Sequence, residues 1–171
     1  IAKSEGLDVK ISNPNIWVNQ VQGPLSLDIL YEACDELKPK SFNYFDNAKV
    51  KMAGQEVVIS RTGFTAEIGW EYYVSPKTDT NLLWNHLMSV GKKYGLIHSG
   101  LDSMDIRRIE AGIMNSGSDF DLTMNPYQAG LGKFVDLYKD HFIGKEALEV
   151  APKDNLILGV LCDKSEPMVL G

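Results

Sequence analysis

Features that mark several protein classes are scarce in this sequence of 171 residues. There are only two cysteines, Cys34 and Cys162, with no CxxC pair and no zinc-ligand spacing, which excludes a disulfide scaffold and a zinc module. Both cysteines lie in apolar contexts, so we expect reduced, buried thiols and a cytoplasmic protein. No apolar run reaches the roughly 20 residues that a membrane helix needs, so we expect no membrane partner.

Basic residues are also few. The chain has 17 lysines and arginines against 23 aspartates and glutamates, which gives a net charge of −6 without any basic run. We therefore expect no nucleic-acid partner, although a few converging cations could still bind a small anion. Hydrophobic residues make up 44% and charged residues 23% of the chain, a balance typical of a folded globular protein.

The sequence does contain an alternation of strand and helix patterns. A helical stripe over 25–37 lies between strand-like segments, and a second stripe over 78–94 ends at a glycine. The order strand, helix, strands, helix predicts an α+β fold with a ferredoxin-like antiparallel sheet and helices on one face. We expect strands at 16–22, 48–52, 56–61 and 70–75, a helix at 101–112 with Ile106 and Ile109 turned inward, and a short helix within 142–148.

A composition shift at residues 151–154 (APKD) predicts a domain boundary. We expect residues 1–150 to form one domain and residues 151–171 to open another, with a buried strand at 155–162. Both ends of the chain look cut, so we expect it to be part of a longer protein.

The stretch at 61–71, RTGFTAEIGWE, places two glycines and two carboxylates just before an expected strand. One interpretation is a hairpin corner with solvent-facing carboxylates. The other is a ligand-binding surface, in which a carboxylate at the end of the strand binds a ligand. The four-residue spacing of Glu67 and Glu71 would put both on one face of a strand, but the pattern alone leaves both interpretations open.

The other polar residues do not indicate a particular reaction. The three histidines, His86, His98 and His141, are scattered and form no nucleophile motif, and we expect no metal site. The charged run at 102–110 is typical of a solvated helix face, although one of its arginines could reach a ligand or a neighbouring domain.

Five ordered motifs resemble those of the tetrahydrofolate-dependent aminomethyltransferase family. They are QGP (22–24), SRTGFTAEIGWE (60–71), GLDSMDIRRIEAGI (100–113), NPYQAGLGKFV (125–135) and FIGKEAL (142–148). The family includes the T-protein of the glycine cleavage system, the folate domains of dimethylglycine and sarcosine dehydrogenases, and a dimethylsulfoniopropionate demethylase.

The resemblance implies three domains around a central folate channel, with this chain holding a folate-binding domain that is partial at its N-terminus and the start of a C-terminal β-barrel. The family's catalytic aspartate lies in its N-terminal part, and no counterpart precedes QGP here. We therefore expect the parent protein to be an enzyme and the isolated chain to be an inactive fragment, and we assign no catalytic residue.

Four residues match positions that the family uses for the cofactor tetrahydrofolate. By resemblance, Glu71 grips the pterin, because a carboxylate can accept its ring N–H and its exocyclic amino group in parallel. Phe64 stands where relatives often have tyrosine and would supply an aromatic wall. Glu67 matches the first glutamate of the motif, with a hydrogen bond to the turn as its expected role, and Arg108 matches the second arginine of the helix motif.

Departures from the family pattern suggest a divergent member. Met104 replaces an arginine, Lys133 a tryptophan and Gln128 a glutamate.

The resemblance implies transfer of a one-carbon unit from a small donor to tetrahydrofolate. That donor could be the aminomethyl group on a lipoyl carrier protein, a methylated amine or a sulfonium compound. The alternative functions are a non-catalytic folate-binding module and a folate-dependent demethylase.

Overall fold

The structure is a computed structural model that describes residues 6–36, 39 and 41–161. The chain forms two compact units, Ile1–Ala111 and Gly112–Gly171. The first unit contains a sheet and three α-helices, and the second is built mostly from turns. Cys34 is buried in the first unit, whereas Cys162 lies outside the described residues.

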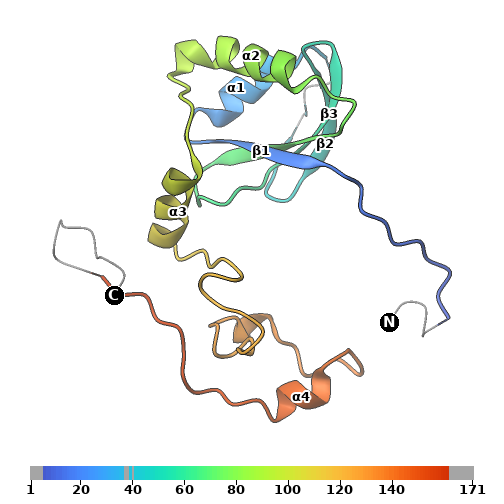
Figure 1. The fold of residues 1–171 in the computed structure, drawn as a ribbon, viewed down its shortest axis with the longest axis vertical. Coiled ribbons are helices and arrows are strands. Elements are labelled where there is room, and N and C mark those ends of the chain that lie inside the picture. The colour runs from blue at the N-terminus through green and yellow to red at the C-terminus, as the bar shows by residue number, and fades with distance from the viewer. Residues whose placement is uncertain (1–5, 37–38, 40, 162–171) are drawn as a thin grey trace. The chain divides into compact units, whose positions relative to one another are not determined.

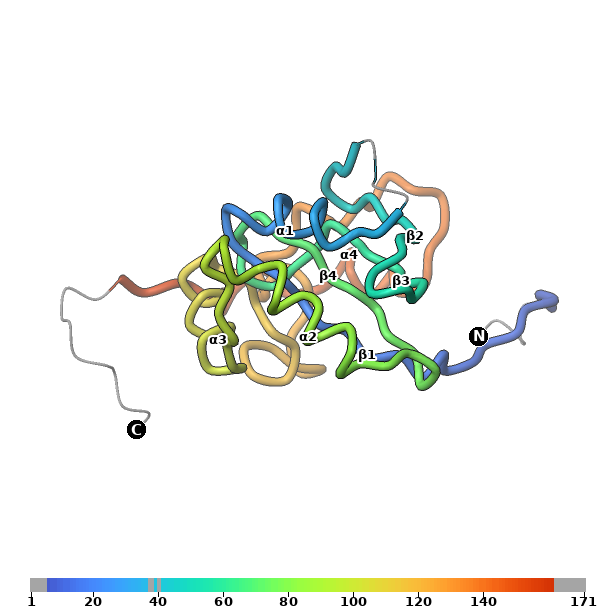
Figure 2. Tube along the Cα trace, turned by 90° about the horizontal axis from the view of Figure 1, so that it is seen from above, coloured from blue at the N-terminus to red at the C-terminus, as the bar shows by residue number. Residues whose placement is uncertain are grey.

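The first unit is organised by one antiparallel sheet of four strands in the order β1-β4-β3-β2. Figure 1 shows α1 and α2 lying over one face of this sheet, and the view in Figure 2 places the same two helices side by side. The predicted α+β class is therefore confirmed, with an antiparallel sheet and helices. The strands are β1 (Trp17–Gln22), β2 (Asn47–Met52), β3 (Gln55–Ser60) and β4 (Gly69–Val74).

The hydrophobic core lies between the sheet and the two helices. Alternate residues of β2, β3 and β4 are buried in it, together with Val21 of β1, which is the period-2 pattern of a sheet with one covered face. Trp70 is fully buried there, and its indole Nε1 donates a hydrogen bond to the carbonyl oxygen of Ser26 at 2.8 Å. The other core residues include Val21, Ile29, Leu30, Ala33, Cys34, Val50, Met52, Val57, Ile59, Tyr72, Val74, Leu83 and Leu87.

Helix α2 (Thr80–Gly91) follows its sequence signals closely. The side chain of Asp79 caps it by accepting a hydrogen bond from the backbone N–H of Leu82. A 3₁₀ turn, η1 (Lys92–Tyr94), continues the helix, and Gly95 ends it with a φ of 74°, the left-handed conformation that favours glycine.

Helix α1 (Ser26–Ala33) is shorter than the predicted 25–37. The chain leaves the helix at Cys34, which has extended backbone angles. The backbone N–H of Asp35 then donates to the carbonyl oxygen of Lys51, and Glu36 forms a bridge with the same residue of β2. Pairing with the edge strand therefore overrides the helical pattern after Ala33.

The order of elements in the first unit is β-α-β-β-β-α, followed by η1 and α3. A ferredoxin-like unit has two strands between its helices and one strand after the second helix. Here three strands lie between α1 and α2, and no strand follows α2 in the described part of the chain, so the predicted ferredoxin-like order is not seen there.

Helix α3 (Leu101–Glu110) forms where the sequence predicts it, but its apolar side chains are not turned inward. Ile106 is 60% and Ile109 63% exposed, so the prediction that they face the core is wrong. The buried side chain of α3 is instead Arg108.

The second unit has little regular structure in its described residues. It contains η2 (Gly132–Phe134) and α4 (Lys145–Glu149), which confirms the predicted turn and short helix near 142–148. Asn125 organises a turn: its Oδ1 accepts from the backbone N–H groups of Tyr127 and Gln128, and its Nδ2 donates to the Pro152 carbonyl.

The strand predicted at 155–162 is wrong over its described part. Residues 155–161 adopt no strand, and Leu158 and Leu161 are 77% and 100% exposed. An apolar segment becomes a buried strand only if neighbouring strands pair with it, and none does so among the described residues. The start of a C-terminal barrel is therefore not seen.

Candidate functional site

Glu71 lies on the face of the sheet opposite α1 and α2. Its neighbours in β4, Trp70 and Tyr72, are buried under the helices, so alternation places Glu71 and Tyr73 on the other face. β4 is an interior strand between β1 and β3, rather than an edge. The carboxylate is therefore held by pairing on both sides, and not at the end of a strand as the sequence suggested.

Two hydroxyl groups hold the Glu71 carboxylate. Thr62 Oγ1 and Tyr73 Oη both donate hydrogen bonds to Oε2, the latter at 3.0 Å. Burial raises the pKa of Tyr73. The Thr62 hydroxyl lowers this pKa and the Glu71 carboxylate raises it, and the pKa stays above its usual value. The phenol therefore keeps its proton and can donate to Glu71. Both bonds fall on Oε2, so within the described part of the chain Oε1 is the oxygen that remains for a bound molecule.

A row of polar residues crosses the sheet at Glu71. Gln20 of β1 and Ser60 of β3 stand directly opposite it in the two strand registers. Residues in such positions have Cβ atoms about 5 Å apart, close enough to act on one ligand. The Oε1 atom of Gln20 is buried and has no hydrogen-bond partner among the described residues.

The side chain of Gln22 fixes the loop that carries Thr62 and Phe64. Its Nε2 donates to the carbonyl oxygen of Thr62 at 3.3 Å, and its Oε1 accepts from Thr65 Oγ1 at 2.9 Å. The amide lies against Gly63 and Gly69, where a Cβ atom would overlap it. Neither glycine has a positive φ, so these residues serve close approach rather than a left-handed turn.

Replacing Gly69 with alanine should therefore lower the free energy of unfolding by about 1–3 kcal/mol, because the Gln22 amide must move and lose its hydrogen bonds. In a Gln22→Ala background the same change should cost much less, since the obstructing amide is gone. Urea unfolding of the four combinations measures this coupling. Gly159→Ala, a site with nothing within 4 Å, is the control; equal costs in both backgrounds would contradict the explanation.

The side chains of Glu67 and Glu71 have different partners. It precedes β4 in the loop, its backbone N–H donates to Thr65 Oγ1 at 3.3 Å, and its carboxylate lies 3.7 Å from Arg107 Nη1 of α3. This pair is half-exposed, so its contribution to stability is small. The backbone N–H of Glu67 thus makes a hydrogen bond within the turn, while its side chain forms an ion pair that reaches the helix.

The other two predicted site residues differ in burial. Phe64 is half-buried in the loop between β3 and β4. Arg108 is 4% exposed, and its Nε donates to Asp105 Oδ1 at 2.8 Å, one turn earlier in α3. Its guanidinium is thus already engaged by its own helix.

Comparison with known proteins identifies the family. The family model described as "GCVT N-terminal domain" matches residues 2–139. The chain belongs to this family. It is 43% identical over 129 residues to an aminomethyltransferase from Caldanaerobacter subterraneus subsp. tengcongensis, covering 75% of this chain and 34% of that protein. It is 43% identical over 145 residues to an aminomethyltransferase from Alkaliphilus oremlandii, covering 82% and 39%.

The chain thus spans between a third and two fifths of the length of these curated relatives. A solved structure, the heterotetrameric sarcosine oxidase from Corynebacterium sp. U-96 in complex with pyrrole 2-carboxylate, overlaps 51% of this chain and 43% of its own. The TM-score is 0.40 at 22% identity, and an overlap of this size carries no conclusion.

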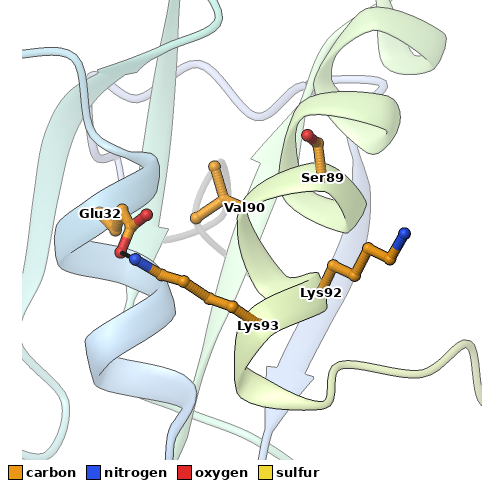
Figure 3. A pocket seen from close by; sticks show the side chains of 5 residues that line it. All are labelled: Glu32, Ser89, Val90, Lys92 and Lys93. Carbon is orange, nitrogen blue, oxygen red and sulfur yellow. Dashed lines mark ion pairs between the residues drawn. The ribbon is translucent and has the colours of Figure 1, made fainter.

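The surface of the chain has two hollows that Glu71 does not line. One, of about 300 Å³, is lined by Ser103, Ile106, Arg107 and Glu110 of α3. The other, of about 630 Å³, lies between α1 and the end of α2. Figure 3 shows Lys93 reaching across it to Glu32, with which it forms an ion pair of 2.6 Å. Both are open, and in the larger one the ion pair already engages the Glu32 carboxylate and the Lys93 ammonium group.

The sequence did not single out three residues of the Glu71 site. Tyr73 could have been found, because a residue two positions along a strand shares the same face. Gln20 and Thr62 could not, because only the strand register and the loop path bring them to Glu71.

No group of three histidine, cysteine or acidic side chains among the described residues could hold a metal ion. His86 Nε2 lies 2.9 Å from the Ala33 carbonyl, which ties α2 to the end of α1. Across the described chain, every helix is too short or too polar to cross a bilayer.

Proposed function

We propose that the protein containing this chain transfers a one-carbon unit from a small donor to tetrahydrofolate, and that Glu71 is the residue that recognises the pterin. The observation that carries this proposal is the half-buried carboxylate on an interior strand, held at Oε2 by Thr62 and Tyr73 and available at Oε1. Membership of the GCVT N-terminal domain family supports it, and the relatives named as aminomethyltransferases favour an aminomethyl donor.

The residues at the site fit a reduced pterin. The pterin edge presents a ring N–H beside an amino group, and Glu71 faces it with a charged acceptor. Phe64, on the loop that Gln22 fixes, would contact the flat ring system. Arg108 would contribute to cofactor binding from α3, where its ion pair with Asp105 holds the guanidinium in place. Tetrahydrofolate itself would supply the nitrogen that accepts the one-carbon unit.

The wider arrangement is part of the same proposal. Residues 1–150 would contribute the folate-binding domain, and residues 151–171 would open the C-terminal barrel. A lipoyl carrier protein would present the donor, in the cytoplasm. In this scheme the chain's own residues bind and orient the cofactor, and positioning of this kind supplies much of the rate enhancement when two substrates must meet.

Calorimetric titration of the full-length protein with tetrahydrofolate tests the proposal. We expect saturable binding with a dissociation constant between about 1 μM and 1 mM, the usual range for enzyme substrates. Incubation with candidate donors, followed by detection of methylene- or methyl-tetrahydrofolate, then identifies the donor class. Absence of binding at about 1 mM tetrahydrofolate would contradict the proposed function.

A further inference from the structure

We propose that Gln20 is a second acceptor in the Glu71 site, and that Gln20 Oε1 and Glu71 Oε1 together receive the two adjacent donors on the edge of the pterin. This inference rests on the proposed function. It deepens it by assigning selectivity for the exocyclic amino group to a residue outside the loop motif.

The first argument is the state of the Gln20 amide. Its Oε1 is buried and without a hydrogen-bond partner among the described residues. A buried, unpaired acceptor costs about 1–3 kcal/mol, so folded proteins seldom keep one without a reason. An apolar side chain of similar length, such as methionine, would avoid that cost in the same strand. A ligand that donates to this oxygen provides the reason for glutamine.

The second argument is the geometry of the row. Gln20 is the register partner of Glu71 in the β1–β4 pair, so the two side chains leave the same face of the sheet side by side. Glu71 Oε2 already accepts from Thr62 and Tyr73, which uses its two lone pairs. Glu71 therefore offers one oxygen to a ligand, and a second acceptor must come from elsewhere. Gln20 lies where that acceptor is needed.

The third argument is complementarity. Two neighbouring acceptors match two neighbouring donors, the ring N–H and the exocyclic amino group. They repel a ligand that carries a carbonyl oxygen in place of that amino group, because acceptors would then face each other with no proton between them. The charged Glu71 would supply most of the affinity, and the neutral Gln20 would supply discrimination between related heterocycles.

The test compares Gln20→Met with the unchanged full-length protein, using tetrahydrofolate and an analogue that carries a methyl group in place of the exocyclic amino group. We expect the variant to bind tetrahydrofolate about tenfold more weakly, the effect of one hydrogen bond, and to bind the analogue with unchanged affinity. Without ligand, its melting temperature should stay the same or rise by a few degrees, because an unpaired buried acceptor is removed.

The control is Gln22→Met in the same strand. Gln22 has hydrogen bonds to the Thr62 carbonyl and from Thr65, so its loss should lower the melting temperature and weaken both ligands alike. Equal weakening of both ligands by Gln20→Met, no change in either, or a lower melting temperature would overturn the inference. If the unchanged protein binds no tetrahydrofolate, the proposed function itself fails. If it binds and only Gln20→Met is silent, the function stands and the second acceptor does not.

Discussion

Replacing Trp70 with alanine is expected to lower the free energy of unfolding of the first unit by about 3–5 kcal/mol. Trp70 is fully buried near the start of β4, where it packs against Tyr72 with ring centroids 5.7 Å apart. The change removes a large apolar surface and leaves a cavity that the sheet cannot close. It also removes the donor to the Ser26 carbonyl, 2.8 Å away at the start of α1.

Two further variants separate these contributions. Trp70→Phe keeps most of the ring but loses the N–H, so we expect a cost of about 1–3 kcal/mol, mainly from the unpaired carbonyl. Trp84→Phe is the matched control, because Trp84 is 41% exposed on α2 and contacts His98 edge to face; its cost should stay below about 1 kcal/mol. Urea unfolding followed by circular dichroism gives all three values. Similar costs for the alanine variant and the Trp84 control would show that β4 is not central to the core.

The elements of the first unit were readable from local patterns because their local and tertiary preferences agree. The β2–β3 hairpin turns at Ala53-Gly54, both with positive φ, as a two-residue hairpin turn requires. Asp79 caps α2, and Gly95 ends the extension of that helix, as the glycine after the stripe at 78–94 predicted. Such agreement across levels is what makes a segment predictable.

Predictions failed where a partner far along the chain decides the outcome. α1 ends at Ala33 because Asp35 and Glu36 pair with Lys51 of β2. Ile106 of α3 is exposed although its spacing suggests a core position, since amphipathic spacing predicts that a face will be covered without saying by what.

The candidate site was predictable only in part, and for the same reason. The motif at 60–71 pointed to Glu71 through resemblance, but not to the interior strand on which it lies. The structure shows that the Gln22 side chain lies against Gly63 and Gly69, a contact that the sequence pattern did not indicate. Gln20 carries no motif at all, because its place beside Glu71 comes from the strand register.

The Glu71→Gln variant of the full-length protein is expected to bind tetrahydrofolate about 10- to 150-fold more weakly than the unchanged protein. This corresponds to losing a hydrogen bond to a charged acceptor, which contributes about 1.5–3 kcal/mol. The amide oxygen of glutamine can still accept from Thr62 and Tyr73, as Oε2 of the carboxylate does. Its NH₂ group then occupies the place of Oε1 and meets the donors of the pterin.

Because the two hydroxyl bonds can be kept, stability should change by less than about 1 kcal/mol while binding is weakened, and this separation distinguishes recognition from a structural role. Glu67→Gln is the matched control: it removes one carboxylate charge from the same loop region, where Glu67 is half-exposed beside Arg107, and should change affinity by less than about twofold. Calorimetry and thermal unfolding of both variants give the four quantities. Equal affinity losses in the two variants would mean that general electrostatics, rather than the geometry of the Glu71 row, attracts the ligand. Unchanged affinity in Glu71→Gln would remove Glu71 from the pterin site.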